Sequence, residues 1–321
     1  MTNIFVAGHN GLVGSAIVRR LKHHYGNDVN IITRARSEVN LMDAAEVENF
    51  FVSNRINQVY LAAAHVGGIV GNNTYPADFI YANLMIQTNV IHAAYASGVR
   101  KMLFLGSTCV YPKLAEVPIK ESALLTGPLE STNEPYAIAK IAGIKMCESY
   151  NRQYGTDYRS VLPCNLYGPG DSFNLETGHL VPSVLRKLHE AKKANATGVL
   201  LWGTGKPLRE FLYVDDAADG CIKVMNEDRR VYEIITEPMQ SHINLSSGWD
   251  IPIVQFARMA ADTVGFTGEI RWDHTKPDGT FRKVTDNTKI KKMGWEPKNS
   301  LDEGLEKTYN WFLNNQGNIR T

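Results

Sequence analysis

Tyr136 and Lys140, a phenol and an ammonium four positions apart, are a candidate acid–base pair. Their segment, Tyr136-Ala137-Ile138-Ala139-Lys140, opens a helical pattern that runs to Gly155, and residues four apart lie one above the other on a helix face. A phenol has a pKa of about 10, and a fixed ammonium one turn away favours its phenolate, which suits a general acid or base. By itself the pair also fits a half-buried tyrosine with a lysine stem packed beside it.

A glycine loop near the amino terminus predicts a cofactor site. The apolar run Ile4–Ala7 leads into Gly8-His9-Asn10-Gly11-Leu12-Val13-Gly14, and an amphipathic helix follows to about Tyr25. Strand, glycine loop and helix in this order are typical of a dinucleotide-binding turn. The glycines permit the tight turn, the approach of the pyrophosphate and close helix packing, and the helix amino terminus offers free N–H groups to the phosphates. A glycine turn without a ligand is the minority interpretation.

Two arginines follow the second predicted strand, Val29–Thr33, where an NAD enzyme of this architecture normally carries an acid for the adenosine ribose. The segment reads Thr33-Arg34-Ala35-Arg36-Ser37, and the first acid is Glu38. Because the planar arginine fork forms charge-assisted hydrogen bonds with phosphate oxygens, we predict NADP as the cofactor, with Arg36 at its 2′-phosphate. Two merely solvated arginines are the competing interpretation.

Further predicted strands deliver small or polar residues to one edge of the sheet. Lys101–Gly106 delivers Ser107 and Cys109, Gln58–Ala62 runs into Ala63 and Ala64, and Asp157–Pro163 leads to Cys164-Asn165-Leu166. Open α/β sheets bind ligands beyond the carboxyl ends of their strands. We therefore expect the reacting groups at Ser107 and Cys109.

The order of the elements predicts an α/β fold, a Rossmann-like doubly wound parallel sheet with a smaller interleaved carboxyl-terminal α/β domain. Later helices are expected at about 181–193, 251–264 and 300–312, and later strands at 199–202, 242–245 and 270–272. We expect residues 1–165 with about 209–245 to form the dinucleotide-binding domain. Residues of about 166–208 with 246–321 would then form the substrate domain.

The amino-acid composition limits the classes of protein to which this chain can belong. The 321 residues are 44% hydrophobic and 21% charged, as in an ordinary globular chain. Lys and Arg number 34 against 33 Asp and Glu, which favours neither nucleic acid nor a membrane surface as a partner. The sequence has no apolar run of membrane-spanning length, no signal-peptide layout and no cysteines at metal-ligand spacing. We expect a cytoplasmic protein without a metal.

The glycine loop, the serine after the fourth strand and the Tyr136/Lys140 pair together resemble the short-chain dehydrogenase/reductase family. The family's Ser–Tyr–Lys set matches Ser107, Tyr136 and Lys140, and the Gly-x-x-Gly-x-x-Gly spacing and chain length resemble its extended, nucleotide-sugar-modifying branch. The resemblance implies that Tyr136 delivers a proton to a carbonyl oxygen while the nicotinamide delivers hydride to carbon. Ser107 would hydrogen-bond the same oxygen, and Lys140 would hold the nicotinamide ribose.

Longer runs resemble the GDP-sugar epimerase-reductases of that branch, over essentially the whole chain. They are Asn72-Asn73-Thr74-Tyr75-Pro76-Ala77-Asp78, Asn133-Glu134-Pro135-Tyr136, Glu148-Ser149-Tyr150-Asn151-Arg152-Gln153-Tyr154-Gly155, Asn165-Leu166-Tyr167-Gly168-Pro169, Arg209-Glu210-Phe211 and Lys276-Pro277-Asp278-Gly279-Thr280. The resemblance implies a GDP-sugar substrate, GDP-4-keto-6-deoxy-D-mannose. The enzyme would epimerise it at C3 and C5 and then reduce the C4 ketone with NADPH, giving GDP-L-fucose.

The resemblance also assigns the acid–base pair of the epimerisation to Cys109 and His179. Epimerisation beside a ketone needs one group to remove a proton and another to return one from the opposite face. Because C3 and C5 both flank the C4 carbonyl, the Ser107 and Tyr136 donors would also stabilise the enolate. From the residues alone, Cys109 fits a small buried residue and His179 an exposed loop residue. Cys147 is expected to serve packing.

The remaining ligands are implied by the same resemblance. Those of the substrate are Ser107, Cys109, Asn165, Lys187, Trp202, Arg209, Asp278 and Lys283. Those of the cofactor are Gly8, Asn10, Gly11, Leu12, Val13, Gly14, Arg36, Leu41, Ala62, Ala63, Ala64, Leu105, Gly106, Ser107, Tyr136, Lys140, Pro163, Asn165, Leu166 and His179. Members of this group can carry a basic residue at the position of Asn10, which is neutral here. A homodimer through the helices near Tyr75–Ala96 and Asn133–Tyr154 is implied as well.

Two rival functions stay open. A nucleotide-sugar 4-epimerase would keep its cofactor bound and consume no NADPH, and a 4,6-dehydratase would carry an acid near Ser107, where this chain has Thr108 and Cys109. A non-catalytic NADP-sensing protein on the same scaffold is disfavoured, because such proteins usually lose the tyrosine or the lysine.

Overall fold

A six-stranded parallel sheet forms the centre of the protein, whose computed structural model describes residues 1–175, 178–276, 278–317 and 319. The strand order is β10-β5-β4-β3-β1-β2. The strands are β1 (Thr2–Ala7), β2 (Val29–Ile32), β3 (Gln58–Leu61), β4 (Lys101–Leu105), β5 (Asp157–Pro163) and β10 (His242–Leu245). Most of their residues are buried, as expected for parallel strands that are covered on both faces.

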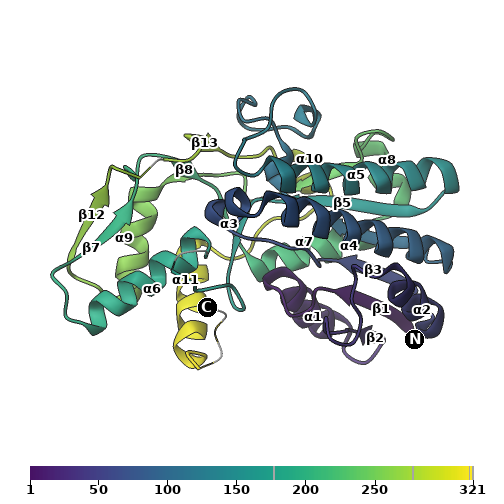
Figure 1. Ribbon diagram of the computed structural model, residues 1–321, viewed down its shortest axis with the longest axis horizontal. Helices are drawn as coiled ribbons and strands as arrows, with labels where there is room; N and C mark the ends of the chain where they lie inside the picture. The colour runs from purple at the N-terminus through teal and green to yellow at the C-terminus, as the bar shows by residue number, and fades with distance from the viewer. Residues whose placement is uncertain (176–177, 277, 318, 320–321) are drawn as a thin grey trace.

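Helices cover both faces of this sheet (Figure 1). On one face α1 (Leu12–Tyr25) packs beside α7 (Val214–Asn226), and their buried residues share one apolar cluster with β1, β4 and β10. On the other face α2 (Ala44–Asn54), α4 (Pro76–Ala96) and α5 (Glu134–Tyr154) share a second cluster. Short helices lie at α3 (Ile69–Thr74), α8 (Arg229–Ile235) and α10 (Thr288–Lys292), and single 3-10 turns at η1 (Thr108–Val110) and η2 (Glu121–Ala123).

The strand order reverses between β1 and β3. The chain goes from β1 to β2 on one side and then returns to β3 on the other side of β1. Ligands of open α/β sheets bind at such a switch point, outside the carboxyl ends of the strands. The glycine loop follows β1, and Ser107 lies just beyond β4, so both belong to this edge.

A second group of elements gathers at the opposite end of the molecule from α2 and β2 (Figure 1). Strand β6 (Asn165–Tyr167) pairs with β9 (Phe211–Tyr213), β7 (Gly198–Trp202) pairs with β12 (Glu269–Asp273), and β8 (Leu208–Arg209) lies between β11 (Ile251–Pro252) and β13 (Arg282–Lys283). Helices α6 (Leu180–Lys193), α9 (Ile253–Val264) and α11 (Leu301–Asn314) enclose a third apolar cluster. The serine that caps α11, Ser300, forms a capping box with Glu303.

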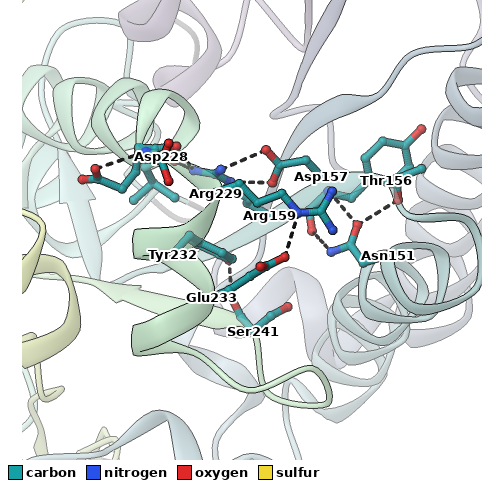
Figure 2. A network of polar contacts seen from close by, with 12 residues as sticks. Asn151, Thr156, Asp157, Arg159, Asp228, Arg229, Tyr232, Glu233 and Ser241 are labelled. Carbon is teal, nitrogen blue, oxygen red and sulfur yellow. Dashed lines mark hydrogen bonds and ion pairs between the residues drawn. The ribbon is translucent and has the colours of Figure 1, made fainter.

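A buried arginine fastens the amino-terminal end of β5 to the helices beside it. Arg159 is fully buried and donates to both carboxylate oxygens of Asp157 at 2.6 and 2.8 Å. Its other nitrogen donates to the carbonyls of Val224 and Glu227, at the carboxyl end of α7, and its guanidinium lies 4.5 Å from the centre of the Tyr232 ring. Figure 2 shows this network, in which each nitrogen of the buried guanidinium has a hydrogen-bond partner. It lies at the opposite end of β5 from Pro163.

The predicted fold class is confirmed, because the sheet is parallel, doubly wound and Rossmann-like. Several boundaries shift by one or two residues, and one shift has a clear cause: the helix predicted from Ile251 begins at Ile253, since Ile251–Pro252 pairs with β8 instead. Strand β13 was not predicted, because two residues are too few to leave a period in the sequence. Within the described residues, no helix is long and apolar enough to cross a membrane.

Candidate active site

Gly8 and Gly14, in the loop between β1 and α1, lie too close to other backbone atoms to carry a side chain. A Cβ at Gly14 would lie 2.1 Å from the carbonyl oxygen of Gly8, and a Cβ at Gly8 would lie 2.6 Å from the backbone nitrogen of Ala63. Gly8 also has φ +84°, in the left-handed region that favours glycine. The first turn of α1 carries no acid, and its N-cap, Gly11, makes no side-chain hydrogen bond. The N–H groups of this turn therefore remain available to an anion, and the loop fits a dinucleotide phosphate.

The two arginines after β2 differ in their surroundings. Arg34 donates to the carbonyl of Thr33 at 2.7 Å and lies 5.5 Å from the centre of the Phe50 ring, so it serves the local structure. Arg36 is exposed. Glu38 accepts a 2.6 Å hydrogen bond from the backbone N–H of Ala35, which ties its carboxylate to this turn. Arg36 is therefore the better candidate for a 2′-phosphate.

Tyr136 and Lys140 lie on the first turns of α5, as the spacing predicted. The Lys140 ammonium lies 5.9 Å from the centre of the Tyr136 ring and 4.8 Å from that of Phe104. It donates to the carbonyl oxygen of Leu105, at the end of β4, over 2.8 Å. Helix α5 is thereby fixed against the strand that delivers Ser107, and the lysine, 3% exposed, is held inside the site.

The expectation that Lys140 favours the Tyr136 phenolate is wrong. Burial raises the pKa of Tyr136 well above its usual value, and a neighbouring Cys109 thiolate would raise it further. Burial also lowers the pKa of Lys140 to about 8, because the apolar surroundings disfavour its charged ammonium form. Tyr136 is consequently protonated at neutral pH, which is the form that gives a proton to a carbonyl oxygen.

Cys109 lies in η1, two residues after Ser107, and its thiol is half-buried. The Cys109 N–H donates to Ser107 Oγ at 3.3 Å, which orients the serine at the start of this turn. Burial raises the pKa of the Cys109 thiol, whereas the charges of Lys283 and Lys140 and a hydrogen bond with Ser107 oppose that rise. Ser107, Cys109, Tyr136 and Lys140 thus form one electrostatically coupled group. Cys147 is fully buried in α5, as predicted for a packing residue.

His179 belongs to a different element from the other predicted catalytic residues. It is the N-cap residue of α6, and its side chain is 51% exposed. Its Nδ1 lies 3.4 Å from a carboxylate oxygen of Asp171, a residue that is 2% exposed. Asp171 was not among the residues predicted from the sequence. The signal available for it was a carboxylate directly after the glycine-rich turn Gly168-Pro169-Gly170.

Trp202 marks the position predicted for the far end of the substrate. Its indole is 53% exposed at the end of β7, and the ammonium groups of Lys187 and Lys276 each lie 5.3 Å from its ring. Burial lowers the pKa of Lys187. Lys276 was missed as a candidate because the sequence places it only in a turn. Its neighbour Pro277, part of one of the runs that carried the resemblance, lies outside the described residues.

The other predicted substrate ligands gather around β8. Arg209 and Lys283 are register partners in the β8/β13 pair. Arg209 donates to the carbonyls of Leu208 and Thr280, and Asp278 accepts from the N–H and hydroxyl of Thr204 at 2.8 and 2.6 Å. Burial lowers the pKa of both cations, and the Asp278 carboxylate raises that of Arg209. Arg209 and Lys283 are therefore two neighbouring cations partly removed from water, an arrangement that suits a multiply charged anion.

Glu210 holds this corner together, and it too was missed. It is 1% exposed, and its two carboxylate oxygens accept hydrogen bonds from Gly248, Ser247 and Thr285, the last through both its N–H and its hydroxyl. Its backbone carbonyl accepts from the side chain of Asn165 at 2.7 Å. One residue therefore fixes Asn165 and, through Thr285, strand β13 with Lys283.

The other predicted cofactor residues lie along the strand ends. Ala62, Ala63 and Ala64 follow β3, Leu105 ends β4, Gly106 follows it, Pro163 ends β5, and Asn165 and Leu166 belong to β6. Leu12 and Val13 begin α1 and pack against the core, Asn10 is exposed, and the carbonyl of Leu41 accepts from Asn89 at 3.1 Å. The parallel sheet brings these segments to one edge.

Known proteins are similar to this chain in sequence. A family model described as "NAD dependent epimerase/dehydratase family" matches residues 4–235. The chain is 56% identical over 317 residues to the GDP-L-fucose synthase of Escherichia coli K12, covering 99% of this chain and 98% of that protein. It is 35% identical to the GDP-L-colitose synthase of Yersinia pseudotuberculosis, covering 98% and 99%.

A solved structure is similar over the whole chain. A GDP-L-fucose synthetase from Naegleria fowleri bound to NADP has a TM-score of 0.89 and 28% identity, covering 100% of this chain and 96% of that one. The family match spans both the glycine loop and the Ser107, Tyr136 and Lys140 set. The chain belongs to the NAD dependent epimerase/dehydratase family, the extended short-chain dehydrogenase/reductase group that its motifs predicted.

Proposed function

We propose that the protein converts GDP-4-keto-6-deoxy-D-mannose to GDP-L-fucose, by epimerisation at C3 and C5 followed by reduction of the C4 ketone with NADPH. The observation that carries the proposal is the coupled group of Ser107, Cys109, Tyr136 and Lys140 at the end of β4, beside a loop that fits a dinucleotide. The name of the 56% identical relative supports this substrate over others.

The bound NADPH would supply the hydride. It would be held by the α1 amino terminus, by Arg36 and by Lys140. Lys140 is already placed by its hydrogen bond to Leu105, so its remaining N–H groups can reach ribose hydroxyls. Tyr136 is protonated and donates to the C4 oxygen during reduction, with Ser107 as a second donor to that oxygen.

During epimerisation the same two donors stabilise the enolate oxygen, because C3 and C5 both flank C4. Cys109 and His179 exchange the protons at carbon. The raised pKa of Cys109 keeps the thiol protonated, as a proton donor requires, while Lys283 and Lys140 stabilise the thiolate that remains after donation. Lys187, Trp202, Arg209, Asp278 and Lys283 bind the GDP moiety.

The test is the decrease in NADPH absorbance with GDP-4-keto-6-deoxy-D-mannose as the substrate. We expect one NADPH oxidised per substrate and GDP-L-fucose as the product. The absence of oxidation at saturating substrate would overturn the proposal. Product analysis separates the rivals, because a 4-epimerase would show no net oxidation, and a dehydratase would release water rather than reduce a ketone.

A second experiment tests the separate roles within the site. Cys109→Ser should slow the incorporation of solvent deuterium at C3 and C5, since a hydroxyl is a much weaker acid than a thiol. Cys221→Ser is the matched control, because Cys221 is a free cysteine buried in α7 away from this group. Unchanged exchange in Cys109→Ser would make Cys109 a packing residue.

The same proposal includes a cytoplasmic homodimer. Tyr81 on α4 and Ile138 on α5 are 59% and 40% exposed on helices that pack side by side, so the two helices present apolar area to a second copy. The four cysteines are free, which fits a reducing compartment. Sedimentation should give a dimer for the native chain and a monomer for Tyr81→Arg, and a monomeric native chain would contradict the dimer.

The division into a cofactor domain and a substrate domain likewise remains a prediction.

A further inference from the structure

The buried carboxylate of Asp171 lies beside the imidazole of His179. Asp171 is 2% exposed, and its Oδ1 lies 3.4 Å from Nδ1 of His179 while accepting a 2.8 Å hydrogen bond from the N–H of Ser172. Its Oδ2 is buried and has no hydrogen-bond partner within the described residues. An ionised carboxylate in such a place is costly unless a positive or donating group faces it. The His179 imidazole is such a group.

The chain fixes Asp171 by a turn that only glycines permit. Gly168 and Gly170 have φ +148° and +88°, and the N–H of Asp171 donates to the carbonyl of Gly168 at 3.2 Å. A Cβ at Gly170 would lie 3.2 Å from Oγ of Ser15, on α1. The turn that carries Asp171 is therefore packed against the helix that begins at the cofactor loop. His179, in contrast, begins α6 of the carboxyl-terminal part.

The contact between Asp171 and His179 bears on which ring nitrogen of the imidazole carries the proton. A carboxylate beside Nδ1 favours the tautomer whose proton is on Nδ1, which leaves the Nε2 lone pair for chemistry. The arrangement follows the logic of histidine bases that a buried carboxylate orients without itself taking the proton. We propose that Asp171 is a positioning residue that holds His179 in the Nδ1–H tautomer and directs Nε2 toward the sugar carbon that exchanges its proton. This inference rests on the proposed function, in which His179 is an acid–base group.

The proton balance is simple. When Nε2 removes a proton from C3 or C5, the C–H electron pair moves into the enolate and its charge develops on the C4 oxygen. The imidazolium that results keeps its Nδ1–H toward the side chain of Asp171. Cys109 returns a proton from the opposite face, and imidazolium and thiolate regain their starting states by exchange with solvent.

The experiment compares Asp171→Asn and Asp171→Glu with the native enzyme. The readouts are deuterium incorporation at C3 and C5, followed by NMR, and the Kd of NADPH, followed by fluorescence. Asp171→Asn should slow exchange about 10- to 100-fold, because the amide can also stabilise the wrong tautomer. The Kd of NADPH should change less than about twofold, and Asp171→Glu should recover part of the exchange rate by restoring the carboxylate.

Asp219→Asn is the matched control, because it removes a carboxylate that lies 2.9 Å from His24 outside the site. Exchange in Asp171→Asn within twofold of the native rate would overturn the inference, and so would a parallel loss of NADPH affinity, which would indicate a structural role.

A measurement on the native protein tests the tautomer of His179 directly. With 15N-labelled histidine, assigned by comparison with His179→Gln, His179 should show the Nδ1–H tautomer, and the Nε2–H tautomer would overturn the inference. Failure of the proposed function gives a different result: the native enzyme itself would not exchange deuterium at C3 or C5. If it does exchange and His179→Gln exchanges equally fast, the assignment of His179 fails, and the role of Asp171 with it.

Discussion

Lys140 lies one helical turn from Tyr136, with its ammonium 5.9 Å from the centre of the tyrosine ring. The two side chains share a pocket in which burial raises the pKa of the phenol and lowers that of the amine. Burial therefore shifts both groups toward their neutral forms: the phenol stays protonated at neutral pH, and a pKa of about 8 leaves the lysine mostly as the ammonium. The tyrosine is ready to donate a proton, and the lysine is poised between its two charge states.

Replacing Tyr136 by phenylalanine removes the proton donor while keeping the ring. NADPH oxidation should fall by about 10²- to 10⁴-fold, the usual contribution of a positioned acid. The Kd of NADPH, measured by fluorescence, should stay within about threefold of the native value, a change below 1 kcal/mol. Tyr154→Phe, at the far end of the same helix, is the control and should leave turnover unchanged. Turnover within tenfold of native in Tyr136→Phe would remove Tyr136 from the chemistry.

The lowered pKa of Lys140 predicts a dependence of stability on pH. Between about 8 in the folded state and 10.5 in the unfolded chain, the unfolded chain binds the extra proton. The free energy of unfolding should therefore rise with pH in this window, by up to about 1.4 kcal/mol per unit from this group. Lys140→Met lacks the titration, so the native-minus-variant difference should rise from pH 8 to 10.5.

Urea unfolding at several pH values measures that difference, and other groups cancel because both proteins carry them. A flat difference across the window would show that Lys140 keeps its ordinary pKa in the folded protein.

Arg36 should set the preference for NADP. Arg36→Ala should weaken NADPH binding by about 10- to 100-fold, since hydrogen bonds between charged groups contribute about 1.5–3 kcal/mol. Binding of NADH, which lacks the 2′-phosphate, should change little. Arg258→Ala, an exposed arginine on α9, is the control for the loss of one surface charge. Equal effects on NADPH and NADH would contradict this assignment.

The close approach of the Gly8 carbonyl leaves no room for a side chain at Gly14. Gly14→Ala places a Cβ 2.1 Å from the carbonyl oxygen of Gly8 in the present backbone. The loop would have to move, and we expect a loss of about 2 kcal/mol or more in the free energy of unfolding, together with weaker NADPH binding. Gly127→Ala is the matched control, because its nearest contact would be an ordinary 3.4 Å to Pro112. Equal stability of the two variants would show that the loop adapts freely.

Much of the site was readable in the sequence because its signals are local. A strand, a glycine loop and a helix follow one another within the first 25 residues, and Tyr136 and Lys140 share one helix face. The resemblance of longer runs then gave the candidate acid–base pair and the substrate. The parallel order of the strands placed Ser107 at the ligand-binding edge before any distance was known.

The charge states and the orienting partners of those groups depend on contacts between distant parts of the chain. Burial depends on what the rest of the chain places around a side chain, so the direction of the Tyr136 pKa shift could not follow from its spacing to Lys140. Asp171 comes next to His179 through a turn and a helix start eight positions apart, and Glu210 joins β13 to Asn165 across long stretches of chain. Such contacts have no periodicity in the sequence, because they depend on how separate elements pack in space. The sequence determined the reacting groups, and the packing determined their charge states and their orienting partners.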